Sequence, residues 1–333
     1  MDQGLNQRRR TPEAGARGRA GILGEGMPLV EDHDFTGFQR NVVEILAKLE
    51  FPKNALKDMA KLSENKDPEI QRFALSKMSG VETKENIQLL ITNLFHNDFR
   101  VRQSAEEALK KMSSAVPNLF KVLVKETLPD RITRIGNILS SHRGAVSSAS
   151  LKTLLGLMEG AIEKFEDSKA HAYFNILKNA NPDFTHKAIM KEAESLKKRK
   201  KYKEEIKLLE MISPTVLFTN EAKWELMVAY LKNSAKDVSQ ISRNNDRALS
   251  MILGGVKAGD KDLVKRLMKE KALNPQDIYY VGFHFSEKLF TEKEFGVNLL
   301  KALIKKGPRT QVGIQSKKRL QTVGTASAIM STN

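Results

Sequence analysis

One amphipathic segment of the chain occurs twice, at a spacing of 31 residues. The segment "NDFRVRQSAEEALKKM" covers residues 97 to 112, and "KDPEIQRFALSKM" stands 31 residues before its counterpart. In the later copy, either Asn97 or Asp98 can cap a helix with its side chain. The apolar and small residues that follow share one helical face: Val101, Ala105, Ala108, Leu109 and Met112. The recurrence predicts a repeated structural unit instead of one isolated helix.

The two copies correspond position by position. The matched pairs are Asp67 with Asp98, Ile70 with Val101, Ala74 with Ala105, and Met78 with Leu109. An apolar helical segment precedes each copy, and a weaker third copy has Ile132 and Gly136 at the Val101 and Ala105 positions. A hairpin of two amphipathic helices cannot bury its apolar face alone, so hairpins of this kind are expected to stack on one another.

Helical spacing continues through most of the chain. Apolar residues follow it in roughly sixteen segments, and no segment shows the alternation of a strand. The aromatic share of 6% and the abundance of Lys, Leu, Glu and Ala also favour helix over sheet. We therefore expect an all-α fold, an irregular α-solenoid of stacked helical hairpins with disordered termini.

The pattern Asp-x-x-Val-Arg-x-x-Ala-x-x-Ala-Leu, as it stands from residue 98 onward, resembles the HEAT repeat family. The resemblance covers residues 50 to 145. It implies a ladder of Asp and Arg side chains that links neighbouring repeats, formed here by Asp67, Asp98 and Arg102. Gln71 and Thr133 replace the arginine in the other copies, so the expected ladder is incomplete.

Later segments are similar to other helical repeats. Two of them place residues as a tetratricopeptide hairpin does: Tyr202, Ile206 and Leu209, then Phe295, Leu299 and Ala302. An ankyrin-like unit lies between them. We expect a disordered basic tail at 1–38, HEAT-like helical repeats at 39–145, tetratricopeptide-like helical hairpins at 146–306 and a second disordered basic tail at 307–333.

The positive charge is concentrated in three segments. Of the net charge of +16, residues 1–20 carry +3, residues 194–207 carry +4 and residues 295–333 carry +7. A strongly basic chain suggests a nucleic-acid partner, but here the charge lies mostly in the two expected tails and in one turn. The rest of the chain is nearly neutral.

The turn cluster at 196–203 has two interpretations. Its cations, with Tyr202 as a base-stacking ring, could neutralise phosphates: Lys197, Lys198, Arg199, Lys200, Lys201 and Lys203. Alternatively, they form a solvated helix end, where the helix dipole favours cations, and Tyr202 packs into the hairpin. The second interpretation is preferred. Lys317, Lys318 and Arg319 form a shorter basic segment in the C-terminal tail.

No catalytic or metal-binding pattern is present in the sequence. The chain has no cysteine, which excludes disulfides and thiolate ligands, and its six histidines lack metal-ligand spacing. Trp224, the single tryptophan, is spaced with Met227, Val228 and Leu231, which favours a place in the core. We therefore expect no cofactor, no metal and no enzymatic activity.

Stacked helical hairpins provide an extended concave surface, which suits a non-enzymatic scaffold that binds one or more proteins. The alternative is a nucleic-acid-binding helical-repeat protein that acts through its basic tails and the 196–203 cluster, non-specifically and at low salt. No apolar run reaches the length of a membrane span, so no membrane partner is expected. The expected location is the cytoplasm.

Overall fold

The computed structural model describes residues 32–49, 55–79, 81–233 and 238–330, and within these ranges all regular structure is helical. Seventeen α-helices follow one another, with two short 3₁₀ turns at Ser113–Ala115 and Arg143–Ala145. The all-α prediction is confirmed for this part of the chain. No helix among the described residues is long and apolar enough to cross a bilayer.

The chain forms two units, Met1–Glu50 and Phe51–Asn333. In the first unit, helix α1 spans Asp32–Ala47. Its side chains Phe38 and Ile45 are exposed. The expected tail at 1–38 therefore ends in a helix from residue 32 onward, and residues 1–31 lie outside the described part.

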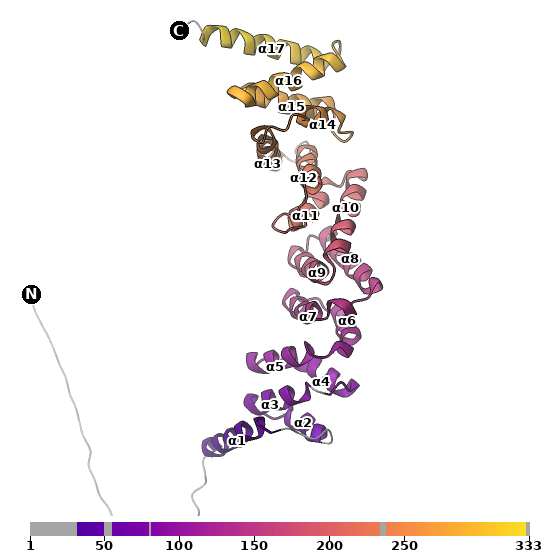
Figure 1. Cartoon of the computed structure of the whole chain (residues 1–333), viewed down its shortest axis with the longest axis vertical. Helices are drawn as coiled ribbons and strands as arrows, with labels where there is room; N and C mark the ends of the chain where they lie inside the picture. Colours follow the sequence, from indigo (N-terminus) through magenta and orange to yellow (C-terminus); the bar gives the residue numbers. More distant parts are fainter. Residues whose placement is uncertain (1–31, 50–54, 80, 234–237, 331–333) are drawn as a thin grey trace, which may run out of the picture. The chain divides into compact units, whose positions relative to one another are not determined.

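The second unit holds the remaining sixteen helices (Figure 1). They are α2 (Leu56–Leu62), α3 (Pro68–Met78), α4 (Lys84–Asn93), α5 (Phe99–Leu109), α6 (Val116–Lys125), α7 (Pro129–Ser141), α8 (Ser148–Glu163), α9 (Asp167–Ala180), α10 (Pro182–Lys198), α11 (Tyr202–Ile212), α12 (Asn220–Asn233), α13 (Val238–Lys257), α14 (Leu263–Lys269), α15 (Pro275–Ser286), α16 (Phe290–Lys306) and α17 (Gln311–Met330).

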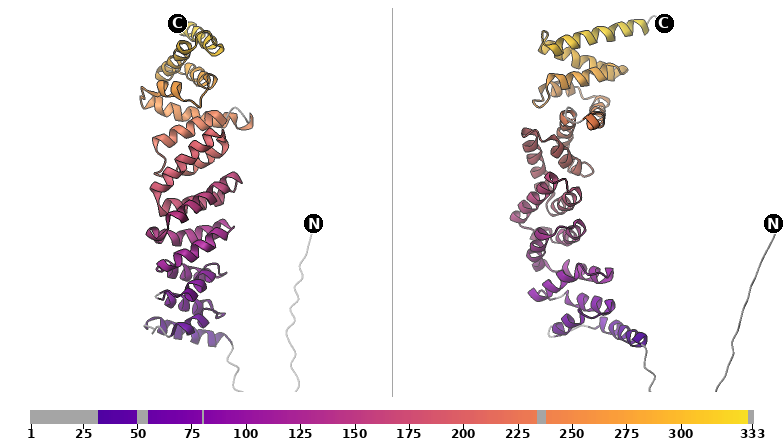
Figure 2. Two further views of the ribbon diagram at one scale, coloured as in Figure 1. Left: turned by 90° about the vertical axis from the view of Figure 1, so that its right-hand side faces the viewer. Right: turned by 180° about the vertical axis from the view of Figure 1, so that it is seen from behind.

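From α2 to α9 the helices form hairpins that pack in two layers. Helices α3, α5, α7 and α9 contact one another in sequence, and α4, α6 and α8 do the same in the second layer. Figure 1 and the two further views of Figure 2 show both layers. Helix α6 packs on α8 and α7 packs on α9, so this packing continues across the Ser-rich segment 140–150.

The repeated segment folds as its sequence predicts. Asp98 caps α5 by accepting a hydrogen bond from the backbone N–H of Arg100 at 2.8 Å, and Asp67 caps α3 in the same way through Glu69. The predicted apolar face of α5 is buried: Val101, Ala105, Ala108, Leu109 and Met112. Pro68 occupies the first turn of α3, where a missing backbone N–H is tolerated.

The third copy is also present as a helix. Ile132 is fully buried on α7, and Gly136 lies against α9. A Cβ at Gly136 would stand 2.4 Å from Cγ1 of Ile176, so glycine is the residue that lets these two helices approach closely. The weak copy therefore keeps the repeat geometry by using a smaller residue.

The disordered tail expected at 307–333 is wrong for residues 311–330, which form α17. Gly307 ends α16, but Thr310 then accepts a hydrogen bond from the N–H of Gly313 at 3.1 Å and starts the next helix. Helix α17 packs on α15 and α16, and its buried positions include two small residues, Gly313 and the fully buried Ser316. Small residues carry little apolar periodicity, which is why the pattern gave no helix here.

Candidate functional site: the clefts beside helix α10

The basic cluster at 196–203 forms the turn between α10 and α11. Lys200 has φ of 58°, a left-handed conformation that is uncommon for a residue with a side chain. The backbone N–H of Lys201 donates to the carbonyl of Leu196 at 2.9 Å, and that of Lys200 donates to Lys197 at 3.0 Å. This pair of bonds closes the end of α10 and fixes the directions in which the cationic side chains leave the turn.

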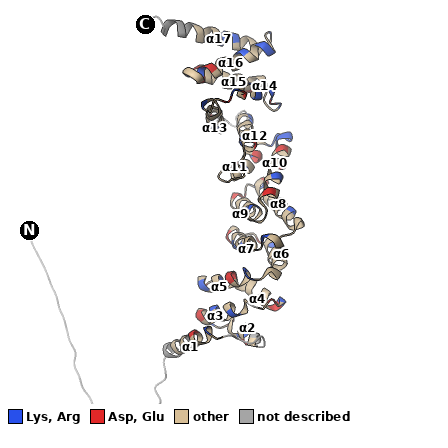
Figure 3. Ribbon diagram, in the orientation of Figure 1, with Lys and Arg blue, Asp and Glu red and all other residues tan. Residues whose placement is uncertain are grey.

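Most cations of the cluster are ion-paired. Lys197 contacts Glu225 at 2.8 Å and Glu270 at 3.1 Å. Three further pairs join Lys198 to Glu194, Arg199 to Glu192 and Lys201 to Glu163. Lys203 also has an interaction partner. The cluster is therefore largely neutralised by carboxylates, two of them on α10 itself and three from other parts of the chain. Figure 3 shows both charges along α10.

Tyr202 is buried, with 7% of its surface exposed. Its ring therefore packs into the hairpin, as the preferred interpretation predicts, and is not available to stack on a base. Lys200 is exposed and forms no ion pair within the described residues. Two features suggested phosphate binding at this turn. The stacking ring is buried, and most of the positive charge is already paired with carboxylates.

Lys197 belongs to a polar centre that the sequence did not indicate. Its ammonium group lies between Glu225 of α12 and Glu270, the residue that follows α14. Glu270 also accepts a hydrogen bond from the indole N–H of Trp224 at 3.0 Å, and the Arg266 guanidinium stacks 4.1 Å from the centroid of the indole ring. Ion pairs and hydrogen bonds join three helices here.

Trp224 accordingly does not belong to the core, which corrects the prediction from its spacing. The side chain is half-buried at the polar centre, while its helical neighbours Met227, Val228 and Leu231 are buried. An indole has one polar atom, and here that atom is bound to Glu270. The spacing correctly placed Trp224 on a helix with a buried face, but an indole that donates to a charged group lies at the edge of the core.

Glu205 of α11 is a buried carboxyl beside this centre. Its side chain is fully buried, and both carboxyl oxygens lack a hydrogen-bond partner among the described residues. Burial raises the pKa of Glu205 to about 8, with Glu225 and Glu270 raising it further and Lys197 opposing them. The carboxyl group is therefore protonated at neutral pH.

The sequence holds a signal for Glu205 that went unused. Tyr202, Glu205, Ile206 and Leu209 recur at the spacing of one helical face, and all four are buried. A charged residue within an apolar stripe indicates a buried titratable group. Because both oxygens are enclosed, this carboxyl cannot reach a bound molecule in the conformation described.

Two adjoining clefts lie on either side of α10. The first, with a volume of about 750 Å³, is bounded by α10, α12 and the turn after α14, and is lined by Lys191, Lys197, Lys200, Glu221, Lys269 and Lys271 among others. The second, of about 730 Å³, lies between α8 and α10 and is lined by Lys152, Leu155, Phe184, Lys187, Ala188 and Lys191 among others. Lys191, Glu194 and Lys198 line both clefts.

The C-terminal basic residues occur on α17. Lys317 and Lys318 are exposed, without ion pairs in the described part of the chain. Arg319, in contrast, donates to the Ser286 hydroxyl at 3.1 Å, contacts Glu287 at 2.8 Å and stacks 4.1 Å from the centroid of Phe283. Arg319 therefore attaches α17 to the end of α15 and is not a free cation.

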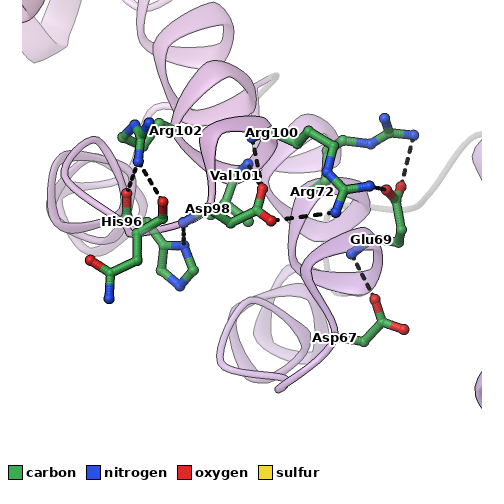
Figure 4. Close-up of polar contacts among 9 residues, drawn as sticks. Asp67, Glu69, Arg72, His96, Asp98, Arg100, Val101 and Arg102 are labelled. Atoms are coloured by element: carbon green, nitrogen blue, oxygen red, sulfur yellow. Dashed lines mark hydrogen bonds and ion pairs between the residues drawn. The ribbon is translucent and has the colours of Figure 1, made fainter. Parts of the chain in front are cut away.

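The expected ladder is formed by a different arginine (Figure 4). Arg102 does not bind an aspartate of a neighbouring repeat; it donates to the backbone carbonyls of His96 and Asn97 at 2.6 and 2.7 Å. Arg100 instead reaches back to Glu69 of the preceding repeat and also contacts Asp98 at 3.3 Å. Glu69 and Arg100 occupy equivalent positions in the two copies, so opposite charges at one repeat position make the link.

No protein-family model and no curated protein matches the sequence. Two solved structures are similar in part. One is the crystal structure of an engineered protein, at 17% identity over 87% of this chain and 96% of the other, with a TM-score of 0.23. The other is a cryo-EM structure of a de novo designed 16-helix transmembrane nanopore, at 16% identity over 89% of this chain and 94% of the other, with a TM-score of 0.14.

Proposed function

We propose that the chain is a non-enzymatic scaffold that binds a partner protein. In this proposal the hairpins from α2 onward form an irregular α-solenoid of HEAT-like and tetratricopeptide-like units, and the partner occupies its concave face. The pair of adjoining clefts on α10 carries the proposal, because together they give about 1,480 Å³ of space beside a single helix. Both clefts combine apolar side chains with charges of both signs, as protein-binding surfaces do.

The chemistry of the polar centre supports binding over catalysis. The most perturbed carboxyl, Glu205, is enclosed, and Lys197 is held by two carboxylates. A general acid or base must come within hydrogen-bonding distance of the group it serves. Glu205 does not meet that condition, and Lys197, which lines the first cleft, has its ammonium group held by two carboxylates. In this proposal the centre therefore braces α10, α12 and the end of α14 and thereby keeps the clefts in shape.

The proposal is tested by retaining proteins on the immobilised full chain, with and without nuclease. We expect a protein partner that stays bound after nuclease treatment. A photo-crosslinking residue at Ala188 in the second cleft should then capture that partner, and one at Lys121 on α6 should not. Loss of every retained protein on nuclease treatment would overturn the proposal.

A second candidate function is non-specific nucleic-acid binding through the C-terminal helices. It rests on the absence of any acidic residue after Glu294 and on the exposed Lys317 and Lys318. Binding of this kind falls by orders of magnitude between about 50 and 200 mM salt when six or more phosphates are contacted. Replacing Lys317 and Lys318 with Glu should abolish it while leaving retention of a protein partner unchanged.

A further inference from the structure

The cleft between α8 and α10 has an apolar floor. Leu155 projects from α8, and Phe184 and Ala188 project from α10; all three are half-buried and line the cleft. Apolar area that is still reached by water gains about 25 cal/mol per Å² when a ligand covers it. The floor therefore favours an occupant that brings apolar side chains of its own.

The cations at the rim of this cleft are uncompensated. Lys152, Lys187 and Lys191 are exposed, and none of them forms an ion pair within the described residues. The carboxylates at the same rim are already engaged, since Glu192 pairs with Arg199 and Glu194 with Lys198. The free charge around the apolar floor is therefore positive.

One more acid, Glu159, lines this cleft. Glu159 lies half-buried on α8, where burial raises its pKa, and the carboxylates of Glu192 and Glu163 raise it further. On the far side of α10, the adjoining cleft adds three more exposed lysines without ion pairs in the described part: Lys200, Lys269 and Lys271. Six lysines without an ion pair among the described residues thus lie along the two clefts beside α10.

We propose that the cleft between α8 and α10 binds an acidic amphipathic helix of the partner protein. This inference rests on the proposed scaffold function and names the chemistry of the partner. The leucine-like face of the bound helix covers Leu155, Phe184 and Ala188, and its Asp and Glu side chains pair with Lys152, Lys187 and Lys191. An amphipathic helix that lays its apolar face into such a groove is a common mode of peptide recognition.

A nucleic acid fits the same surface less well. A phosphate backbone has no apolar side chains to cover the floor, and Tyr202, the ring of the cluster that could stack on a base, is buried. Charge attracts either polyanion, whereas the apolar floor selects the peptide.

The direct test measures fluorescence anisotropy of a labelled helical peptide added to the full chain. The probe has about 18 residues, or about five turns, with Leu on one face and Glu on the other. Matched probes replace the Glu with Lys or the Leu with Ser, and a single-stranded oligothymidylate of similar length serves as a polyanion without apolar side chains. We expect the acidic amphipathic peptide to bind at least about tenfold more tightly than each of the three other probes.

Two sets of variants separate charge from shape. Lys152→Glu, Lys187→Glu and Lys191→Glu together should weaken binding of the acidic peptide by about tenfold or more, while Lys121→Glu with Lys125→Glu on α6 should leave it unchanged. Ala188→Arg adds a positive charge but fills the floor. This variant should bind the acidic peptide more weakly and oligothymidylate more tightly than the wild type does. Tighter binding of the peptide to this variant overturns the proposal.

The remaining outcomes distinguish this inference from the scaffold function. Tighter binding of oligothymidylate than of the acidic peptide overturns the peptide assignment. If the Lys152, Lys187 and Lys191 variant still retains the nuclease-resistant partner at full strength, the cleft is not the docking site and the scaffold function stands. If the chain retains no protein at all, both proposals are wrong. Circular dichroism of each variant confirms that the helices are intact.

Discussion

The repeat region, α3 to α9, and the C-terminal region, α10 to α17, are both built from helices that pack on near neighbours in the chain, but the contacts differ in kind. In the repeat region a large apolar side chain meets a small residue, as Ile176 of α9 meets Gly136 of α7. In the C-terminal region two backbones meet directly. A Cβ at Gly296 of α16 would stand 2.3 Å from the backbone nitrogen of Ser286 and 2.6 Å from the carbonyl carbon of Phe285.

The two kinds of contact respond differently to change. A side chain at a crowded position can rotate, whereas a backbone in a packed helix cannot move without shifting its whole element. The C-terminal region also contains a buried carboxyl, Glu205, where the repeat region keeps its acids at caps and in surface pairs. Regular side-chain packing therefore tolerates variation that the C-terminal contacts do not.

The largest expected effect is at the backbone contact. Gly296→Ala should lower the free energy of unfolding by more than about 3 kcal/mol, because the added methyl group meets the backbone of α15 and not a movable side chain. Chemical denaturation monitored by circular dichroism measures the change. A variant as stable as the wild type would mean that α15 and α16 are not in direct contact.

The next effect is the pH dependence contributed by Glu205. Its pKa is raised to about 8 in the folded chain, above the ordinary glutamate value of 4.5, so the folded state holds a proton that the unfolded state releases. This contribution to stability is therefore complete below the unfolded pKa and is lost as the pH rises towards 8. The loss is on the order of 3 kcal/mol at neutral pH.

Glu205→Gln should remove that loss, because the amide does not ionise. The stability of the variant relative to the wild type should be smallest near pH 5 and should grow steadily to about pH 8. Denaturation curves of both proteins across this range provide the measurement. Parallel stability profiles would show that the carboxyl is not buried as described, and the polar centre of Lys197, Glu225 and Glu270 would need another explanation.

The contrast between the regions also explains what the sequence could predict. The buried face of α5, its cap at Asp98 and the weak third copy at Ile132 follow from apolar period and cap chemistry, which are local. The ladder prediction named Asp67 and Arg102, whereas the residues that pair, Glu69 and Arg100, each lie two positions away. The clue was the opposite charge of Glu69 and Arg100 at equivalent repeat positions, which an alignment of apolar residues ignores.

The rest depends on tertiary contacts that no local pattern contains. The ion pairs of Lys197 and Lys201 could not be predicted, because their partners, Glu225, Glu270 and Glu163, are distant in the sequence. Helix α17 escaped prediction because its buried positions include the small residues Gly313 and Ser316, and because a charged residue, Arg319, attaches it to α15. Of the cations named from the sequence, four line the clefts: Lys197, Lys198, Arg199 and Lys200. The clefts themselves could not be predicted, since a cleft is formed by the spacing of helices and not by the residues of one.

A smaller effect is expected at a side-chain contact of the repeat region. Ala105→Leu should cost about 1–3 kcal/mol, because Ala105 is fully buried where α5 packs on its neighbours. Glu107→Leu is the matched control on the exposed face of the same helix. Thermal melts should rank Ala105→Leu well below Glu107→Leu, and the reverse order would show that the packed face of α5 has been misassigned.

The smallest expected effect is at helix glycines with open space around them. It shows whether the effect of a glycine substitution depends on the region or on the local contact. A Cβ at Gly156 of α8 would meet nothing within 4 Å, and the same holds for Gly254 of α13 in the C-terminal region. Replacing either with Ala should raise the free energy of unfolding by about 0.5–1 kcal/mol, because the unfolded chain loses conformational freedom and the helix gains a better former. Urea denaturation of the two variants beside Gly296→Ala measures all three positions on one scale. If Gly254→Ala gains as much stability as Gly156→Ala, the loss at Gly296 is due to its backbone contact alone. If Gly254→Ala loses stability instead, the whole C-terminal region is packed more tightly than its contacts indicate.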